Sequence, residues 1–224
     1  ARSINIVAVK ASERAGRKRV IATARRLGLS GDFKATPSLA LGVGEVTLLE
    51  LTQAYAPFAN GGAGVWAYGI DEIRDRAGHI LYRRRGTGPG RVVATPDVRA
   101  MNGMLAEAVR IGTGRAARLD RPAAGKTGTS QNFRDAWFVG FTAELVAGVW
   151  MGNDDGSPMK GVTGGGLPAA LWHDFMAQAH AGAPPRPLPG LGMVPASKKN
   201  PREDLRDAPS LWQRIFATLS EGDG

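Results

Sequence analysis

Hydrophobic positions in the first part of the chain recur at helical spacing. Residues 6–27 place apolar side chains on one stripe with arginine and lysine elsewhere, and Gly16 interrupts the stripe, so the pattern predicts two consecutive helices. A loop rich in glycine, proline and serine follows over residues 31–44. Thr47 and Glu50 then stand at the spacing of a capping box, which predicts the start of a third helix.

Strands are predicted farther along the chain. Residues 65–70 and 79–83 alternate between apolar and polar side chains around a turn at residues 74–78, a pattern typical of a β-hairpin. Two apolar runs, residues 136–141 and 145–151, predict a pair of buried strands. Helices and strands together indicate a protein of the α/β class.

Two more helices are predicted within the main part of the chain. Thr95 and Pro96 indicate a helix start, with Thr95 as the N-cap and Pro96 at the first helical position. A glycine-rich loop at residues 161–166 precedes a further helix from Pro168 through Ala179. No apolar run has the length needed to span a bilayer, because Glu144 and the turn before it divide the longest one.

Composition narrows the possible functions. A chain of 224 residues with 43% hydrophobic content can bury the core of one large domain, or of one domain and a small appendage. The net charge of +9 fits nucleic acid, an anionic lipid or wall polymer, or plain solubility, and plain solubility is the commonest explanation. The basic clusters at residues 14–26 and 83–85 lack aromatic side chains at base-stacking spacing, so no nucleic-acid partner is expected.

No cofactor or metal ion is expected either. Without cysteine the chain forms no disulfide and no thiolate metal site. Its histidines are too dispersed to indicate a metal site or a Ser-His-Asp triad; they are His79, His173 and His180.

A proline-rich segment at residues 184–189 predicts a stiff linker. We therefore predict a domain over residues 1–182, a linker over 183–209, and a short amphipathic helix with a tail over 210–224. The apolar stripe of that helix consists of Leu211, Trp212, Ile215, Phe216 and Leu219. The stripe either packs back on the domain or docks on a partner, and packing back is favoured because a short isolated helix is seldom stable in water.

The stretch at residues 125–130 is the strongest candidate for chemistry. It is a polar strand ahead of the two buried strands, and it offers the ammonium of Lys126 and the hydroxyls of Thr127 and Thr129. Gly128 would let a ligand approach the backbone closely. Such a strand suits an anionic, acyl-bearing ligand, and a plain polar strand end is the alternative.

Two polar residues near the start of the chain form a second motif that accompanies the one at residues 125–130. Ser3 and Asn5 form Ser-x-Asn, which, followed about 120 residues later by Lys-Thr-Gly, resembles two motifs of the penicillin-binding proteins and serine β-lactamases. The residues at 122–130, 134–141 and 148–155 narrow the resemblance to the transpeptidase domain of a class A, bifunctional penicillin-binding protein. It extends from residue 1 to about residue 180. The fold that it implies is an incomplete transpeptidase fold in which all predicted strands, the hairpin included, form one antiparallel sheet covered by helices.

The resemblance also implies a role for each candidate residue. Lys126 would attract the substrate carboxylate and lower the pKa of neighbouring groups, Thr127 and Thr129 would bind that carboxylate, and the Thr129 N–H would be one oxyanion donor. Ser3 would relay a proton between the base of the nucleophile and the leaving nitrogen, while Asn5 would bind the substrate amide. From the residues alone, Ser3 is equally well explained as a helix N-cap, and Asn5 as a polar surface residue.

The third family motif, Ser-x-x-Lys, supplies the nucleophile and would lie upstream of Ser3. One match, Ser157 to Lys160, lies after Lys-Thr-Gly among glycines that leave no helix to hold it, so we reject it. We therefore expect this chain to be the C-terminal part of a catalytic domain whose first part is absent or is another polypeptide. We also expect that penicillin does not acylate this part alone.

The resemblance implies a peptidoglycan D,D-transpeptidase that cross-links stem peptides through a serine acyl-enzyme. Its partners would be D-Ala-D-Ala stem peptides, β-lactams and the missing N-terminal part of the domain. A membrane anchor of the parent protein would hold it on the extracytoplasmic, periplasmic side of a bacterial inner membrane. Two alternatives stay open: a D,D-carboxypeptidase or β-lactamase, which needs a deacylating base, and a non-catalytic β-lactam-sensing or wall-binding module.

Overall fold

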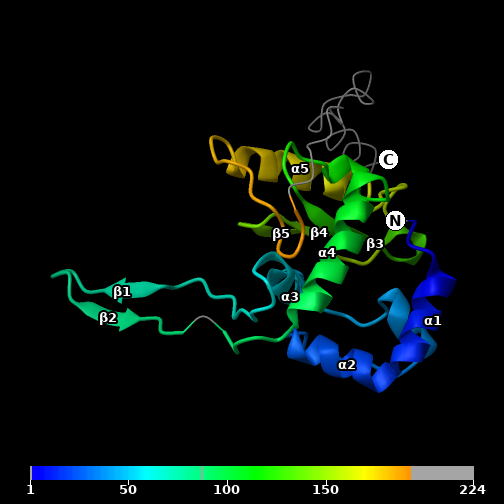
Figure 1. The fold of residues 1–224 in the computed structure, drawn as a ribbon, viewed down its shortest axis with the longest axis horizontal. Helices are drawn as coiled ribbons and strands as arrows, with labels where there is room; N and C mark the ends of the chain where they lie inside the picture. The colour runs from blue at the N-terminus through cyan, green and yellow to red at the C-terminus, as the bar shows by residue number, and fades with distance from the viewer. Residues whose placement is uncertain (1, 87, 193–224) are drawn as a thin grey trace.

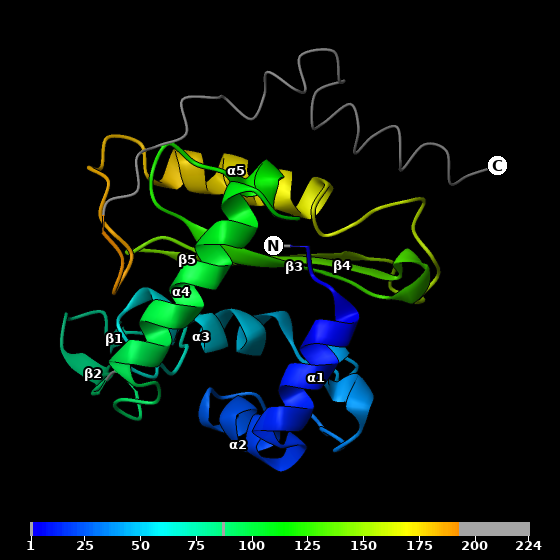
Figure 2. The same cartoon turned by 45° about the vertical axis from the view of Figure 1, so that its right-hand side comes forward.

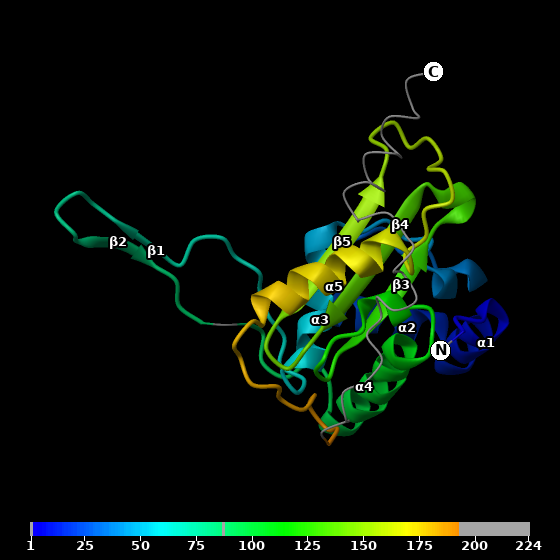
Figure 3. The ribbon, with the colours of Figure 1, turned by 90° about the horizontal axis from the view of Figure 1, so that it is seen from above.

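A three-stranded antiparallel sheet forms the centre of the fold. A computed structural model describes residues 2–86 and 88–192. The strands β3 (Ala124–Thr129), β4 (Asp135–Phe141) and β5 (Val146–Gly152) lie side by side in the order β3-β4-β5 (Figure 3). β4 is the central strand and carries most of the buried side chains of the sheet, while β3, with its polar sequence, forms an edge.

Helices pack on both faces of this sheet (Figure 2). On one face, Phe138 of β4 contacts Trp172 of α5 (Leu167–Ala179), with ring centroids 5.2 Å apart. On the other face, Phe141 of β4 contacts Tyr55 of α3 (Leu48–Ala59), with ring centroids 6.3 Å apart. Phe138 and Phe141 point to opposite faces because side chains alternate along a strand. Two apolar cores result, one on each side of the sheet.

The remaining helices follow the sequence pattern closely. α1 (Asn5–Ala15) and α2 (Arg17–Arg26) are separated at Gly16, whose φ of 89° is a conformation that glycine adopts readily. The capping box is present, because the Thr47 hydroxyl accepts a hydrogen bond from the Glu50 N–H at 3.1 Å. Short 3₁₀ helices, in chain order, are η1 (Pro37–Leu41), η2 (Arg115–Ala117) and η3 (Gln131–Phe133).

α4 (Thr95–Arg110) lies against β3 and the apolar cores. Its N-cap is Ala94, one residue before the predicted Thr95, and no side chain caps it. The predictions of Thr95 as N-cap and of Pro96 at the first helical position were therefore both wrong by one position, because Thr95 is the first residue of the helix and Pro96 the second.

The predicted hairpin exists but does not join the central sheet. β1 (Glu72–Arg74) and β2 (Ile80–Arg83) form a separate two-stranded sheet, which projects from the body (Figure 1). The implied single sheet containing every strand was thus wrong, and residues 65–70 are not a strand. Period-two alternation indicates a strand without identifying its pairing partner, and here β1 and β2 pair only with each other.

Residues 183–192 run back along the body of the domain. Leu188 has only 2% of its surface exposed and packs into the core beside Phe141, while the Asn102 amide donates a hydrogen bond to the Pro189 carbonyl oxygen at 2.9 Å. The rest of the predicted linker, and the helix and tail at 210–224, lie outside the described residues. The boundary at residue 183 remains a prediction.

Replacing Asn102 by alanine is expected to lower the free energy of unfolding by about 1–3 kcal/mol, because it removes hydrogen bonds to one buried and one partly buried carbonyl group. The Asn102 side chain is fully buried and donates to the Phe58 oxygen at 3.0 Å as well as to Pro189. Denaturant unfolding measures the change. The control is Met104→Ala on the exposed side of the same helix, expected to change stability by less than about 0.5 kcal/mol. An equal loss of stability in both variants would contradict the stabilising role of the Asn102 hydrogen bonds.

A buried histidine follows α5. The Thr142 hydroxyl oxygen accepts hydrogen bonds from the Glu144 and Leu145 N–H groups, so its own proton is directed to the His180 Nε2 atom, 3.0 Å away. Nδ1 then carries the imidazole proton and faces the Glu144 carboxylate at 3.5 Å. Burial, reinforced by the nearby Arg121 charge, lowers the pKa of His180 from its ordinary value of 6.5.

His180 therefore predicts a loss of stability in acid. Because its folded-state pKa is lowered, the unfolded chain binds the proton more readily, and stability present above pH 6.5 is lost as the pH falls through the lowered value. We expect His180→Gln to flatten the pH dependence of the unfolding free energy below pH 6.5. The matched control is Gln178→Ala on the exposed side of α5, which carries no ionisable group and should keep the wild-type slope. An unchanged slope in His180→Gln would disprove the role of His180.

Candidate active site

The structure brings Ser3 and Lys126 together. The Lys126 ammonium on β3 donates a hydrogen bond to the Ser3 Oγ atom at 3.0 Å and another to the Thr127 carbonyl oxygen at 2.8 Å. Ser3 precedes α1 and has a φ of 50°, an uncommon left-handed value for a residue other than glycine. It does not cap the helix, because the N-cap is Ile4 and no side chain caps α1. The interpretation of Ser3 as an N-cap was therefore wrong.

Lys126 is only partly exposed at the edge of the sheet. Burial lowers the pKa of its ammonium from the ordinary 10.5, because desolvation disfavours the charged form. A lysine with a lowered pKa releases its proton more easily, and the Ser3 hydroxyl at hydrogen-bond distance can both accept and donate one. The pair is therefore suited to proton transfer as well as to holding an anion.

Thr127 has a partner that the sequence did not suggest. Its hydroxyl lies 2.7 Å from that of Thr113, which belongs to the turn after α4. In the sequence Thr113 lies between two glycines, and this pattern indicated only that the preceding helix ends there. The contact joins the turn to β3 and fixes the direction of the Thr127 hydroxyl.

The glycine-rich loop at residues 161–166 lies along the same strand. The Gly164 N–H donates a hydrogen bond to the Thr129 Oγ1 atom at 3.1 Å. A Cβ atom added to Gly164 would collide with the backbone oxygens of Gly128 and Trp137. The sequence predicted the loop but not its position, and the run of glycines was the only signal that backbones meet closely here.

Asn5 is not brought into this cluster. It is the first residue of α1 and is exposed, and no hydrogen bond joins its side chain to any other residue in the described part of the chain. Its predicted role in binding a substrate amide remains a prediction.

Ser157 lies in an irregular segment after β5. Its N–H donates to Asp155 and its hydroxyl accepts from Asn153, and residues 153–160 contain no helix. Ser157 and Lys160 are thus not held on a helix, as the surrounding glycines indicated. Within residues 2–86 and 88–192, no helix combines the length and apolar character required to cross a membrane, and no cluster of metal-ligating side chains is found.

Comparisons with known proteins give consistent matches. A family model described as "Penicillin binding protein transpeptidase domain" matches residues 1–157. Penicillin-binding protein 1A of Aquifex aeolicus is 40% identical over 178 residues, which cover 79% of this chain and 24% of the relative. Penicillin-binding protein 2D of Bacillus subtilis is 37% identical over 194 residues, which cover 81% and 27%.

Solved structures of penicillin-binding proteins are similar to this chain in fold. Penicillin-binding protein 1A from Haemophilus influenzae has a TM-score of 0.75 at 28% sequence identity, covering 84% of this chain and 34% of that chain. PonA1 from Mycobacterium tuberculosis, in complex with penicillin V, has a TM-score of 0.63 at 23% identity, covering 79% and 55%.

The fold is that of a transpeptidase-type α/β domain with an antiparallel sheet, as predicted. This chain belongs to the penicillin-binding protein transpeptidase domain family. The resemblance inferred from Ser-x-Asn and Lys-Thr-Gly is thereby confirmed. The chain spans about a quarter of the length of the curated relatives that it matches.

Proposed function

We propose that the complete domain is a peptidoglycan D,D-transpeptidase that acts through a serine acyl-enzyme. In this proposal the present chain supplies Ser3 and the β3 strand, and the nucleophile comes from an upstream part of the domain. The observation that carries the proposal is the hydrogen bond from the Lys126 ammonium to the Ser3 hydroxyl, which joins two family motifs at 3.0 Å.

Proton transfer is the proposed task of this pair. When the nucleophile attacks the peptide carbonyl, its proton must leave and the departing nitrogen must gain one. Ser3 accepts and donates within one hydroxyl, and Lys126, with its lowered pKa, keeps that hydroxyl oriented and exchanges a proton with it. The reaction then needs no metal ion and no cofactor.

The rest of β3 holds the substrate in this proposal. The hydroxyls of Thr127 and Thr129 and the charge of Lys126 bind the terminal carboxylate, and the Thr129 N–H stabilises the oxyanion. Gly128 has no side chain to obstruct the ligand. Thr113 and Gly164 position the two threonines through the hydrogen bonds described above.

The proposed partners are D-Ala-D-Ala stem peptides, β-lactams and the upstream part of the domain. We further propose that the parent protein is anchored to the membrane by a segment outside this chain and works on the extracytoplasmic, periplasmic side. Penicillin V is a suitable probe, because it is the ligand in the PonA1 structure.

Mass spectrometry tests the proposal. This chain, and a version extended upstream through Ser-x-x-Lys, are each incubated with penicillin V. We expect an adduct on the extended chain alone, and cross-linked product when stem peptides replace the penicillin. Ser157→Ala in the extended chain is the control and should be labelled normally. An adduct on the unextended chain would overturn the assignment of an upstream nucleophile, and labelling without product would indicate a sensor.

A further inference from the structure

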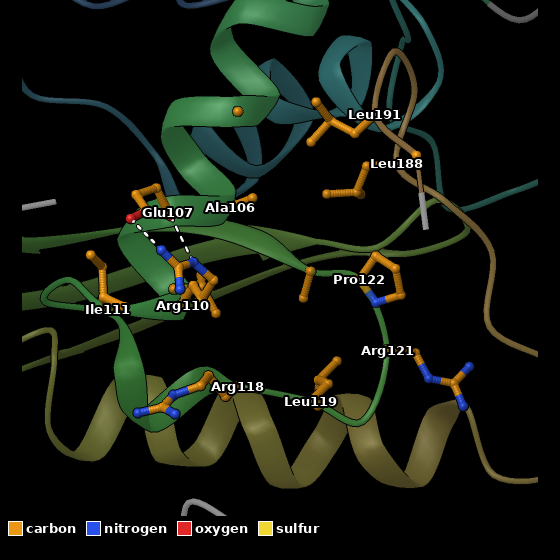
Figure 4. A pocket seen from close by; sticks show the side chains of 14 residues that line it. Ala106, Glu107, Arg110, Ile111, Arg118, Leu119, Arg121, Pro122, Leu188 and Leu191 are labelled. Atoms are coloured by element: carbon orange, nitrogen blue, oxygen red, sulfur yellow. Dashed lines mark hydrogen bonds and ion pairs between the residues drawn. The ribbon is translucent and has the colours of Figure 1, made fainter. Parts of the chain in front are cut away.

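A cavity of about 640 Å³ lies between the second half of α4, the loop at residues 118–123 and the segment at residues 188–192 (Figure 4). Its lining contains neither Ser3 nor any residue of β3, β4 or β5. The cavity therefore does not extend the candidate active site. Within residues 2–86 and 88–192, further contacts for a substrate bound at Lys126 are offered by the sheet face that carries this lysine.

The sheet face that carries Lys126 also carries two tryptophans. Lys126 lies opposite Val139 of β4, and Trp137, two residues before Val139, points to the same face because side chains alternate along a strand. Trp137 lies opposite Trp150 of β5, and their ring centroids are 6.2 Å apart. Diagonal neighbours on adjacent strands are about 7–8 Å apart, so the aromatic pair begins next to Lys126.

A carboxylate completes this group. Asp135 is two residues before Trp137 on β4 and therefore lies on the same face. Its Oδ1 atom accepts a hydrogen bond from the Trp150 indole N–H at 3.0 Å. Its Oδ2 atom has no hydrogen-bond or ion-pair partner within the part of the chain that the structure describes. Because Trp150 is 38% exposed and Asp135 is also partly exposed, a ligand can reach both.

A glycine lies opposite Trp137 on the neighbouring strand. Gly128 of β3 is the residue paired with Trp137, and a Cβ atom added to Gly128 would lie 3.2 Å from the Trp137 Cβ atom. A side chain at position 128 would crowd the indole ring and stand beside the Lys126 side chain. Because glycine has none, β3 leaves the surface open between Lys126 and the aromatic pair.

An aromatic pair beside a carboxylate is suited to an ammonium group on an alkyl chain. The face of an indole ring attracts a cation, and its apolar surface packs against the methylene groups that carry the cation. A carboxylate oxygen without a partner accepts a charge-assisted hydrogen bond from the same ammonium. A neutral amide in place of the ammonium would lose both electrostatic contacts, so this group of residues can distinguish the two.

We propose that Asp135, Trp137 and Trp150 bind a side-chain ammonium group of the donor stem peptide. The inference rests on the proposed function, because cross-linking joins the acyl group of one stem to an amine on another, and stems that serve in both roles each carry that amine. Two residues of extended chain span about 7 Å, so an amine-bearing residue one or two positions before the reacting bond reaches this site from Lys126. Binding is non-covalent and adds no chemical step.

Two matched peptides test this preference in the extended domain. One is acetyl-lysyl-D-alanyl-D-alanine with a free side-chain ammonium, and the other is the same peptide with that amine acetylated. Release of D-alanine in the first turnover gives the rate constant of acylation for each peptide. We expect the free-amine peptide to react roughly tenfold faster with the wild type, the discrimination that one cation–π contact and one exposed ion pair provide.

Variants of the site should change the ratio of the two rate constants. Asp135→Asn should reduce it to about threefold or less, because asparagine keeps an oxygen for the Trp150 N–H but has no charge. Trp137→Leu should also lower it, because one ring is lost while Asp135 stays in place. The ratio compares two peptides on one variant, so a general loss of activity does not change it. The matched control, Asp154→Asn on the exposed turn after β5, should keep the tenfold ratio.

Two results would overturn the proposed ammonium site: equal rates for both peptides with the wild type, or an unchanged ratio in Asp135→Asn. Labelling of the wild type by penicillin V, which carries no ammonium group, separates this failure from a failure of the proposed function. If penicillin V labels the extended domain while either of these results is found, only the ammonium site is wrong. If penicillin V does not label it, the proposed function is wrong as well.

Discussion

Replacing Lys126 by methionine in the extended domain is expected to lower the rate of acylation by penicillin V by about 10²–10⁴-fold, the range typical of a lost acid–base group. Methionine retains an apolar side chain of similar length but has no ammonium. The Ser3 hydroxyl loses the donor that lies 3.0 Å away. In the proposed mechanism the substrate carboxylate also loses its positive partner. Time-resolved mass spectrometry of the adduct measures the rate.

Two further variants make this result specific. Lys160→Met removes the lysine of the rejected Ser-x-x-Lys match and should leave the rate unchanged. Lys126→Arg keeps the positive charge, but arginine does not release its proton, so it should restore carboxylate binding without restoring the rate. If Lys126→Arg acylates at the wild-type rate, Lys126 acts through its charge alone. If Lys126→Met acylates at the wild-type rate, the proposed role of Lys126 in acylation is wrong.

Replacing Gly164 by alanine is expected to lower the acylation rate by about 10²-fold, the cost of displacing groups at a reactive site by about 1 Å. The new Cβ atom would collide with the backbone oxygens of Gly128 and Trp137, which cannot rotate away as a side chain could. The loop must therefore move off β3 and release the hydrogen bond between Gly164 and Thr129. Stopped-flow acylation and thermal unfolding, measured together, separate an effect on the site from general destabilisation.

The matched control is Gly166→Ala in the same loop. There the nearest atom to a new Cβ would be the Thr163 carbonyl oxygen at 3.4 Å, an ordinary contact. This variant should acylate within a few-fold of the wild type. A similar loss of rate in both variants would mean that loop flexibility, and not the close approach at Gly164, determines the effect.

Local sequence signals predicted the helices well. The Thr47 and Glu50 pair and the break at Gly16 act within a few residues, so each is complete in the sequence itself. The cap of α4 was misplaced by one residue because Thr95 and Ala94 lie next to each other before the same proline. Element boundaries are decided by such small differences.

Long-range contacts were not predictable in the same way. A hairpin was predicted, but no signal in residues 65–83 indicates that its two strands pair only with each other and not with the central sheet. The contacts of Thr113 with Thr127 and of Gly164 with Thr129 join segments that meet only after folding. Ser3, Lys126 and their neighbours on β3 were found through the family motifs, which carry information that periodicity does not.

The bond between Ser3 and Lys126 has a consequence for the order of folding. The two residues are 123 positions apart. Bringing them together closes a long loop, and this lowers the entropy of the chain before the hydrogen bond can form and stabilise the fold. One hydrogen bond cannot offset that cost, and α1 and the sheet must already be formed when Ser3 reaches β3. Since Ser3 also adopts a left-handed backbone conformation, the segment before α1 is a natural point for local opening. Local opening there would separate the Ser3 hydroxyl from the Lys126 ammonium while the sheet and both cores stay folded.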